Sequence, residues 1–237
     1  MPPIEIPPSR RSFLRHALSA PLAVYVVGEQ ITRTTPADAA TDPPAASYQP
    51  TYFNPDEWRL LTKLVDRLIP ADEEGPGALE AGVPEFIDRQ TNEPYGYGAL
   101  WYMQGPFREA PPEFGYQLPF TPRALYRAAL PAVESAVRKS RGSAFDELPD
   151  AAKDEVLAQL QQGQLDIQVM PSAVFFHQLL QNTREGYFCD PVHGGNKDMA
   201  SWRMIGFPGA RADYMDWVEQ YGRKYPFPPV SLGPSKG

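Results

Sequence analysis

The sequence predicts a mainly α fold: a single irregular helical domain in which short helices are joined by long loops rich in proline and glycine. Three observations lead to this class. Apolar residues recur at helical spacing in several segments, the alternation typical of strands is scarce, and there is no internal repeat. The 237 residues include 28 prolines and 18 glycines, which supply many helix ends and ordered turns. A chain of this length is sufficient for one core.

The first helix is expected to begin at Pro55. Asn54 can act as its N-cap, and Glu57 lies three residues after Asn54, as in a capping box. Apolar residues then recur at helical spacing until Pro70 ends the run: Trp58, Leu61, Leu64, Val65 and Leu68. This stripe must pack against another element, and each buried side chain would contribute roughly 1.5–3 kcal/mol.

A loop, a short helix and a long aromatic segment are expected next. Residues 70–78 form the loop, where the adjacent acids Asp72-Glu73-Glu74 are expected to be solvated. The short helix covers 83–91. Residues 92–120 are rich in Tyr, Phe, Gly and Pro and have no clear period. Their aromatic side chains either pack in the core, which is the commoner case, or form a surface for a partner.

The longest helix is expected from Thr121-Pro122 to about Arg141, with Gly142 as its terminator. Pro131 within it predicts a kink. The residues expected to face inward are Leu130, Val133 and Val137.

Two further helices and a short tail helix complete the expected fold. One begins at Leu148-Pro149 and stops at Gly163, and the next runs from Pro171-Ser172 to about Gly186. The latter has one face made of Phe176, Leu179, Leu180 and Thr183. The tail past Arg211 could add a short helix through Met215, Trp217 and Val218.

The amino terminus is typical of a bacterial twin-arginine export signal. A pair of arginines is followed by a large apolar pair, and the residues that define this motif are Arg10, Arg11, Phe13 and Leu14. The stretch 17–28 then has no charged residue. It is too short to span a membrane core, which needs about 20 residues, and it fits the apolar region of a signal peptide. The alternative is a basic tail in which Arg-Arg occurs by chance.

These patterns divide the chain into four segments. Residues 1–39 are the predicted signal peptide, which ends at the cleavage sequence Ala37-Asp38-Ala39. Residues 40–51 are expected to be an extended linker, 52–225 the helical domain and 226–237 a C-terminal tail.

Charge and composition exclude several classes of partner and cofactor. After residue 39 the chain has 18 basic and 26 acidic side chains, a net charge of −8, and no Lys/Arg cluster, so a nucleic-acid partner is not expected. The single cysteine, Cys189, excludes an internal disulfide and a Cys-rich metal site. There is no Cys-x-x-Cys-His or Gly-x-Gly-x-x-Gly motif, and Gly75-Pro76-Gly77 follows a helix end rather than a strand. No catalytic, cofactor-binding or metal-binding residue is predicted.

The export route and the missing cofactor motifs together predict a companion protein. The twin-arginine route moves folded proteins and typically serves those that receive a cofactor in the cytoplasm. Because this chain has no motif that would hold one, we expect its signal to export a second, cofactor-loaded polypeptide bound to it.

The histidines and the cysteine offer little catalytic chemistry. His16 lies in the signal, and His177, on a helix beside two phenylalanines, is expected to be a core histidine. His193 lies in a loop with Asp and Asn, and the simpler interpretation is a turn in which the Asp and Asn side chains hydrogen-bond to their own backbone. The alternative is a free-standing hydrolase that uses His193 as a catalytic residue. Cys189 is expected to be a buried, inert thiol, or else an intermolecular disulfide partner.

Two blocks of sequence carry a family resemblance. The first contains FNPDEW from Phe53, DRLIPAD from Asp66 and GPGALEAGVP from Gly75. The second contains EGYFCDP from Glu185, GGNKDM from Gly194 and WRMIGFPG from Trp202. On these runs, in this order, residues 52–220 resemble the gluconate 2-dehydrogenase subunit 3 family. Cys189 departs from the family pattern, in which a small residue is usual.

The resemblance implies a periplasmic complex associated with the inner membrane through its partners. Members of this family accompany a large FAD-binding subunit of the glucose–methanol–choline type, often together with a multihaem cytochrome c that carries haem c. The small subunit itself has no established catalytic residue or cofactor. The twin-arginine translocase is its other expected partner.

The leading interpretation is therefore a non-catalytic small subunit of gluconate 2-dehydrogenase, which oxidises D-gluconate to 2-dehydro-D-gluconate. Alternatives are the same role in a glycoside 3-dehydrogenase or another sugar dehydrogenase, and an export chaperone that dissociates after delivery. The partner interface is expected in the glycine-rich loops near the second block, at Tyr187, Cys189, His193, Gly194, Gly195, Asn196, Trp202 and Phe207.

Overall fold

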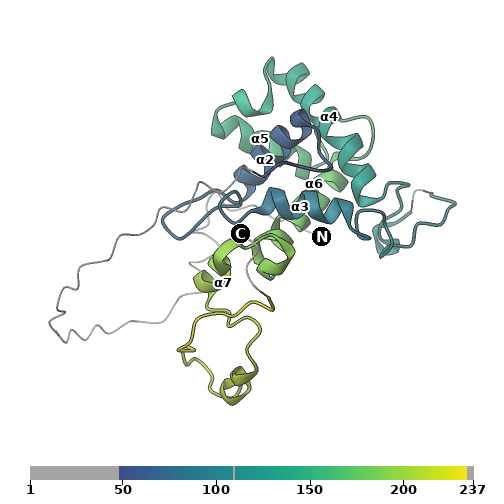
Figure 1. Cartoon of the computed structure of the whole chain (residues 1–237). Helices are drawn as coiled ribbons and strands as arrows, with labels where there is room; N and C mark the ends of the chain where they lie inside the picture. The colour runs from purple at the N-terminus through teal and green to yellow at the C-terminus, as the bar shows by residue number, and fades with distance from the viewer. Residues whose placement is uncertain (1–47, 109, 234–237) are drawn as a thin grey trace. The chain divides into compact units, whose positions relative to one another are not determined.

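A computed structural model describes residues 48–108 and 110–233 (Figure 1). The chain divides into two units, Met1–Ala46 and Ser47–Gly237, and the described residues belong to the second. The predicted export signal, with Arg10, Arg11, Phe13 and Leu14, lies outside the described residues.

The predicted mainly α class is confirmed, since the described residues form helices joined by loops, with only two isolated β-bridges among them. The α-helices are α2 (Pro55–Leu68), α3 (Val83–Asn92), α4 (Pro122–Arg141), α5 (Asp150–Gln161), α6 (Ser172–Phe188) and α7 (Ala200–Ile205). Short 3₁₀ helices lie between and after them: η1 (Pro112–Phe114), η2 (Phe145–Glu147), η3 (Pro191–His193), η4 (Lys197–Met199) and η5 (Ala212–Trp217). No helix of the described chain has the length and apolar character to cross a membrane.

The start of α2 confirms the predicted capping box. The Asn54 side chain accepts a hydrogen bond from the Glu57 amide at 2.9 Å, and the Glu57 carboxylate accepts one from the Asn54 amide at 3.0 Å. Two backbone donors that the helix leaves unpaired are thereby satisfied. The buried face of the helix contains Leu60, Leu61, Leu64 and Val65.

Helix α6 is the central element, because it contacts α2, α3, α4, α5 and α7. Phe175, Leu179 and Tyr187 on it are buried in one apolar cluster. A polar network crosses this core: the Tyr126 hydroxyl on α4 donates to Asn182 Oδ1 at 2.9 Å, and Asn182 Nδ2 donates to the Tyr95 hydroxyl at 2.8 Å. These bonds join α4, α6 and the segment after α3.

The structure corrects one prediction on α6. His177 is exposed rather than a core histidine, because Phe175, Phe176 and Leu179 take the core-facing positions of the helix and leave His177 on the opposite side. Leu180, expected on the apolar face, is half-buried.

Helix α4 and the short tail helix both lie where the sequence predicts them. Helix α4 is assigned as one element from Pro122 to Arg141 with Pro131 inside it, and the kink stays a prediction. The short tail helix is present as η5 and is a 3₁₀ rather than an α-helix.

Candidate partner-binding surface

Asn196 joins the loop after α6 to the elements on either side of it. Its side chain is buried; Nδ2 donates to the Cys189 carbonyl at 2.9 Å, and Oδ1 accepts from the Ser201 amide at 3.1 Å and its hydroxyl at 2.7 Å. The Asn196 amide donates to the Gly186 carbonyl at 3.0 Å. Its φ of 44° lies in the left-handed region, which Asn tolerates better than most residues. One side chain therefore fixes the end of α6, the loop and the start of α7.

Close backbone contacts in this loop require residues without side chains. A Cβ on Gly195 would lie 2.2 Å from the Gly186 carbonyl oxygen and 2.9 Å from Cys189 Sγ. A Cβ on Gly186 would lie 2.7 Å from a ring carbon of Phe86 on α3. The glycines let the loop pack directly on α6, and let α6 pack directly on α3.

Trp202 continues this packing from α7. Its side chain is buried, its indole Nε1 donates to the Phe188 carbonyl at 2.8 Å, and its ring meets the Phe207 ring edge to face at 5.0 Å. Phe207 is partly exposed beside it. The indole thus has a partner for its polar atom, as a buried Trp requires.

The same loop is attached to α3. The Lys197 amide donates to the Ala81 carbonyl at 3.2 Å, and Lys197 Nζ forms an ion pair with Glu85 at 2.6 Å. Helix α3 therefore receives the loop on its first turn.

The predicted interface residues divide by exposure. Tyr187, Gly194, Gly195, Asn196 and Trp202 are buried, Cys189 is half-buried, and His193 and Phe207 are exposed. Their role as partner contacts stays a prediction. Of the eight, only His193 and Phe207 have exposed side chains that a partner could reach without a rearrangement of the loop.

Cys189 and His193 line one shallow groove of about 440 Å³ with Glu185 and Phe188. A catalytic cysteine beside a histidine needs a lowered pKa, because the thiolate is the nucleophile. Burial instead raises the pKa of Cys189 to about 11, and its Sγ lies 3.5 Å from the Gly186 carbonyl. This geometry favours the inert thiol over nucleophilic chemistry.

We expect Cys189 to react with iodoacetamide at pH 8 about 100-fold more slowly in the folded chain than in the chain unfolded in guanidinium. With a pKa of about 11, roughly 0.1% of the thiol is ionised at this pH, against about a quarter for an unperturbed thiol. The measurement is alkylation followed by intact-mass spectrometry. Rates within tenfold of each other would contradict the raised pKa.

Asp88 on α3 is fully buried and attaches the first described residues to the domain. Its Oδ2 accepts hydrogen bonds from the Tyr48 hydroxyl, the Thr51 amide and the Thr51 hydroxyl, each at 2.8 Å. Its Oδ1 accepts from the amides of Tyr52 at 2.9 Å and Phe53 at 3.2 Å. Burial alone would raise the pKa of Asp88, but these bonds to the charged form hold it below its usual value.

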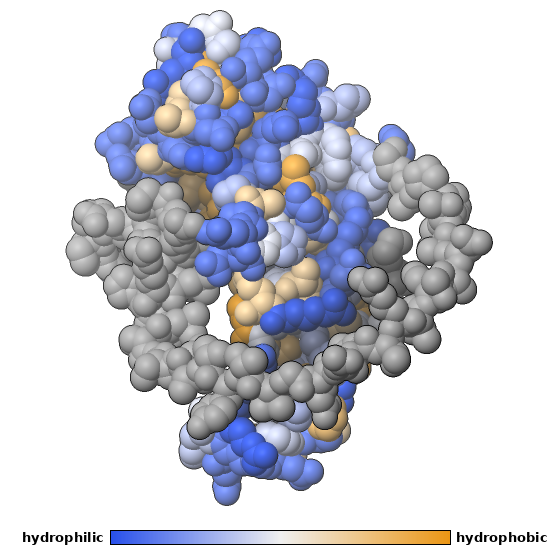
Figure 2. Space-filling model, turned by 90° about the vertical axis from the view of Figure 1, so that its left-hand side faces the viewer, coloured by the Kyte–Doolittle hydropathy of each residue, from blue (hydrophilic) through white to orange (hydrophobic). Residues whose placement is uncertain are grey.

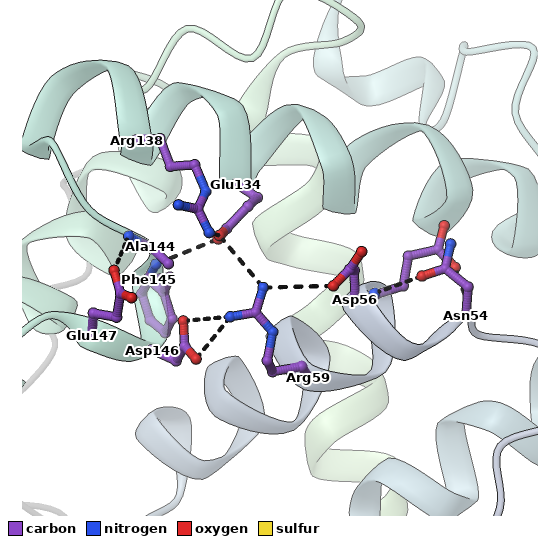
Figure 3. Close-up of polar contacts among 10 residues, drawn as sticks. Asn54, Asp56, Arg59, Glu134, Arg138, Ala144, Phe145, Asp146 and Glu147 are labelled. Carbon is purple, nitrogen blue, oxygen red and sulfur yellow. Dashed lines mark hydrogen bonds and ion pairs between the residues drawn. The ribbon is translucent and has the colours of Figure 1, made fainter.

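A charged network holds η2 against α2 and α4 (Figure 3). Arg59 lies at its centre, with Nη1 at 2.8 Å from both Asp146 oxygens and Nη2 at 3.8 Å from Asp56 and from Glu134. Arg138 completes it at 2.8 Å from Glu134. Four of these side chains, Asp56, Arg59, Glu134 and Arg138, line a groove of about 550 Å³. Each charge of the network faces an opposite charge, so the network is suited to joining elements rather than binding a ligand.

The turn closest to a phosphate cradle does not fit a nucleotide cofactor. The Gly77 amide, which a phosphate would need as a donor, already donates to the Glu80 carboxylate at 2.9 Å. Among residues 48–108 and 110–233, no three His, Cys, Asp or Glu side chains are grouped closely enough to hold a metal ion.

The segment from Gly209 to Leu232 forms a closed loop, which we call the C-terminal arm. At its base, the Ala210 amide donates to the Val230 carbonyl at 2.7 Å, and the Val230 amide donates to the Pro208 carbonyl at 3.1 Å. Figure 1 shows the arm leaving the end of α7 and returning beside it. The end of the arm is attached to the residues after α6 by Asp190, whose carboxylate accepts hydrogen bonds from the Ser231 hydroxyl at 2.5 Å and the Leu232 amide at 2.9 Å.

Tyr225 organises the interior of the arm. Its ring meets Tyr214 at 5.1 Å, Trp217 at 5.5 Å and Phe227 at 5.6 Å, each edge to face, and Arg211 lies over the Phe227 ring at 5.3 Å. Contacts of this kind are worth about 0.5–1.5 kcal/mol each beyond the apolar area they bury. The arm therefore has a defined internal structure.

Large apolar side chains are exposed on the segment 93–120, most of all at Leu100, Tyr102 and Phe114, and on the arm; others are exposed singly at Val169, Phe188, Ile205 and Phe207. Figure 2 shows that, on the face it draws, apolar residues gather in a middle region, with a few more among the mainly hydrophilic residues above and below it. The exposed apolar residues of the arm are Tyr214, Met215, Val218, Tyr221, Phe227, Val230 and Leu232. The aromatic segment 92–120 combines the two roles that its sequence allows: Trp101 and Tyr116 pack together with ring centroids 4.8 Å apart, while Tyr102 is exposed.

Neither the Asp88 contacts nor the arm was predicted from the sequence. The signal for Asp88 would have been a single acid on the apolar face of a short helix. The signal for the arm was the density of aromatic residues between 214 and 227.

Comparison with known protein families places this geometry in context. The model of the family described as gluconate 2-dehydrogenase subunit 3 matches residues 55–209. No curated protein and no solved structure gives a significant match.

Proposed function

Because the chain belongs to the gluconate 2-dehydrogenase subunit 3 family, we propose that it is the non-catalytic small subunit of an FAD-dependent gluconate 2-dehydrogenase. In this proposal it carries the large subunit through the twin-arginine route to the periplasm and stabilises it there. The oxidation of the C2 alcohol of D-gluconate to a ketone takes place on the FAD of the large subunit, and a cytochrome c subunit accepts the electrons.

The match over residues 55–209 is the observation that carries the proposal. A family defined as a numbered subunit of a dehydrogenase implies a complex with the other subunits. Two features agree with a non-catalytic role: burial raises the pKa of Cys189, which disfavours a nucleophilic thiolate, and the Gly77 amide is already bonded to Glu80 rather than open to a phosphate.

The export role is supported by the motif around Arg10 and Arg11, together with the absence of cofactor motifs from the printed sequence. The twin-arginine route carries folded proteins, and this chain has no motif for a cofactor of its own. Its signal is explained if the cofactor belongs to a second protein that is exported bound to this chain. The membrane association of the complex then comes from the other subunits.

Replacement of both Arg10 and Arg11 by lysine is expected to leave at least ten times less of the FAD-containing subunit in the periplasm, because the paired arginines are the recognised part of the signal. The measurement is the distribution of gluconate-dependent dye reduction and of bound FAD between cytoplasmic and periplasmic fractions of the native host. Arg33→Lys, which lies outside the motif, is the matched control and should leave export unchanged.

Two results would contradict parts of the proposal. A large subunit that still reaches the periplasm with the double variant would show that it does not depend on this signal. A wild-type chain that is exported but never purifies with a flavoprotein would exclude the subunit role.

A further inference from the structure

We propose that the C-terminal arm, Gly209–Leu232, is the surface by which this chain recognises its flavin-carrying large subunit. The inference rests on the proposed function, and it names the part of the chain that makes the contact. The occupant is a protein that presents an apolar surface, rather than a lipid surface or a second copy of this chain.

The arm is preorganised for binding. Its base is closed by the backbone hydrogen bonds of Val230 with Ala210 and with Pro208, and Asp190 attaches it to the loop after α6. The ring of Tyr225 and its aromatic neighbours hold the interior. A loop that is ordered before binding loses little conformational entropy when it binds, so more of its contact energy contributes to affinity.

The exposed side chains of the arm exceed what its own folding needs. Met215 is 76% exposed and Tyr221 is 90% exposed, and neither belongs to the aromatic cluster around Tyr225. The arm also contains Arg211 and Arg223, each placed over an aromatic ring. Tyr, Met and Arg are enriched in the centres of protein–protein interfaces.

The net charges of the arm and of the helical domain indicate which kind of partner the arm binds. The arm has three basic side chains, Arg211, Arg223 and Lys224, and three acidic ones, Asp213, Asp216 and Glu219, so its net charge is zero. Adsorption to an anionic membrane requires an excess of Lys and Arg, which the arm lacks. Residues 48–209 have 14 basic and 22 acidic side chains, a net charge of −8, so two copies brought together through their arms would repel each other. A different protein remains as the occupant that the charges favour.

The position of the arm in the chain fits a role in choosing one particular partner. The family match ends at residue 209, where the arm begins. The matched residues make up the helical domain. The arm adds a surface beyond this domain that can discriminate between different flavoprotein subunits.

The test compares two pairs of substitutions in the tagged full-length chain, expressed in its native host. The arm variant carries Met215→Asp and Tyr221→Asp. The matched control carries Leu100→Asp and Tyr102→Asp, which are 75% and 82% exposed on the segment 93–120. The readout is the amount of FAD recovered per tagged chain after purification, and thermal unfolding of each purified chain verifies its fold.

We expect wild type and control to retain about the same FAD per chain, and the arm variant to retain at least tenfold less with an unchanged melting temperature. If the arm variant retained as much FAD per chain as the wild type, or if only the control lost FAD, the inference would be overturned and the subunit role would remain intact. Absence of a flavoprotein from the wild type would overturn both. Arm-dependent binding to phosphatidylglycerol vesicles, or arm-dependent self-association in sedimentation, with FAD recovery unchanged, would assign the arm to lipid or to a second copy and overturn the inference.

Discussion

Replacement of Asp88 by asparagine is expected to lower the free energy of unfolding at pH 7 by about 3 kcal/mol, because hydrogen bonds to a buried charged acceptor are among the strongest that a protein makes. The carboxylate accepts five bonds from the segment Tyr48–Phe53. An amide in its place offers one acceptor oxygen and turns a donor toward groups that are themselves donors. The measurement is urea unfolding of both chains.

The effect of Asp88→Asn has a defined pH dependence. The pKa of Asp88 is lowered in the folded chain relative to about 3.9 in the unfolded chain, so its contribution is fully present above pH 4 and is lost as pH falls through the folded pKa. The gap between wild type and variant should therefore narrow below pH 4. Asp216→Asn, at an exposed position, is the control and should change stability by less than about 0.5 kcal/mol. A gap that stays constant down to pH 2 would contradict a charge-based role.

Replacement of Gly195 by alanine is expected to lower the free energy of unfolding by about 3 kcal/mol or more, because the added Cβ would lie 2.2 Å from the Gly186 carbonyl oxygen. That oxygen cannot move away easily, since it accepts the Asn196 amide and belongs to the buried helix α6. The measurement is the same unfolding experiment, combined with near-ultraviolet circular dichroism of the neighbouring Trp202.

A glycine with space around it provides the comparison for Gly195. A Cβ on Gly233 would meet only Val192 Cγ2, at 3.5 Å, which is an ordinary contact, and its backbone does not lie in the left-handed region. Gly233→Ala should therefore change stability by less than about 0.5 kcal/mol. Equal effects at the two positions would show that the contact with Gly186 is not what requires glycine at 195.

The elements predicted correctly are those whose signals lie within a few residues of each other. The start of α2 was predicted from Asn54, Pro55 and Glu57, and the same three residues make the observed cap. The start of α4 followed from Thr121-Pro122, and its end followed from Gly142, which has the expected left-handed φ of 79°. Capping depends on local geometry, so a local pattern is enough to predict it.

The features missed by sequence analysis depend on residues far apart in the chain. Asp88 binds residues 35–40 positions before it, and nothing in its own helix indicates those partners. His177 was placed in the core because of its phenylalanine neighbours, but the choice of buried face is made by packing against several other helices at once. Long-range contacts of this kind override what a short window can show.

The loop 190–209 has a packing role that a sequence pattern does not indicate. Its glycines predict a contact surface, which stays a prediction, and the structure adds that Gly195 packs against α6. The family membership that its sequence indicated is confirmed by the match over residues 55–209.

Helix α3 has a consequence for how the domain opens. Within ten residues it receives Tyr48–Phe53 through Asp88 and the loop after α6 through Glu85 and Lys197. Neither segment can detach by a fluctuation of α3 without releasing the other, so the free energy of that opening includes both sets of contacts. The two distant stretches of chain thus behave as one cooperative unit, and local fraying at the beginning of the domain is suppressed by contacts made more than a hundred residues later.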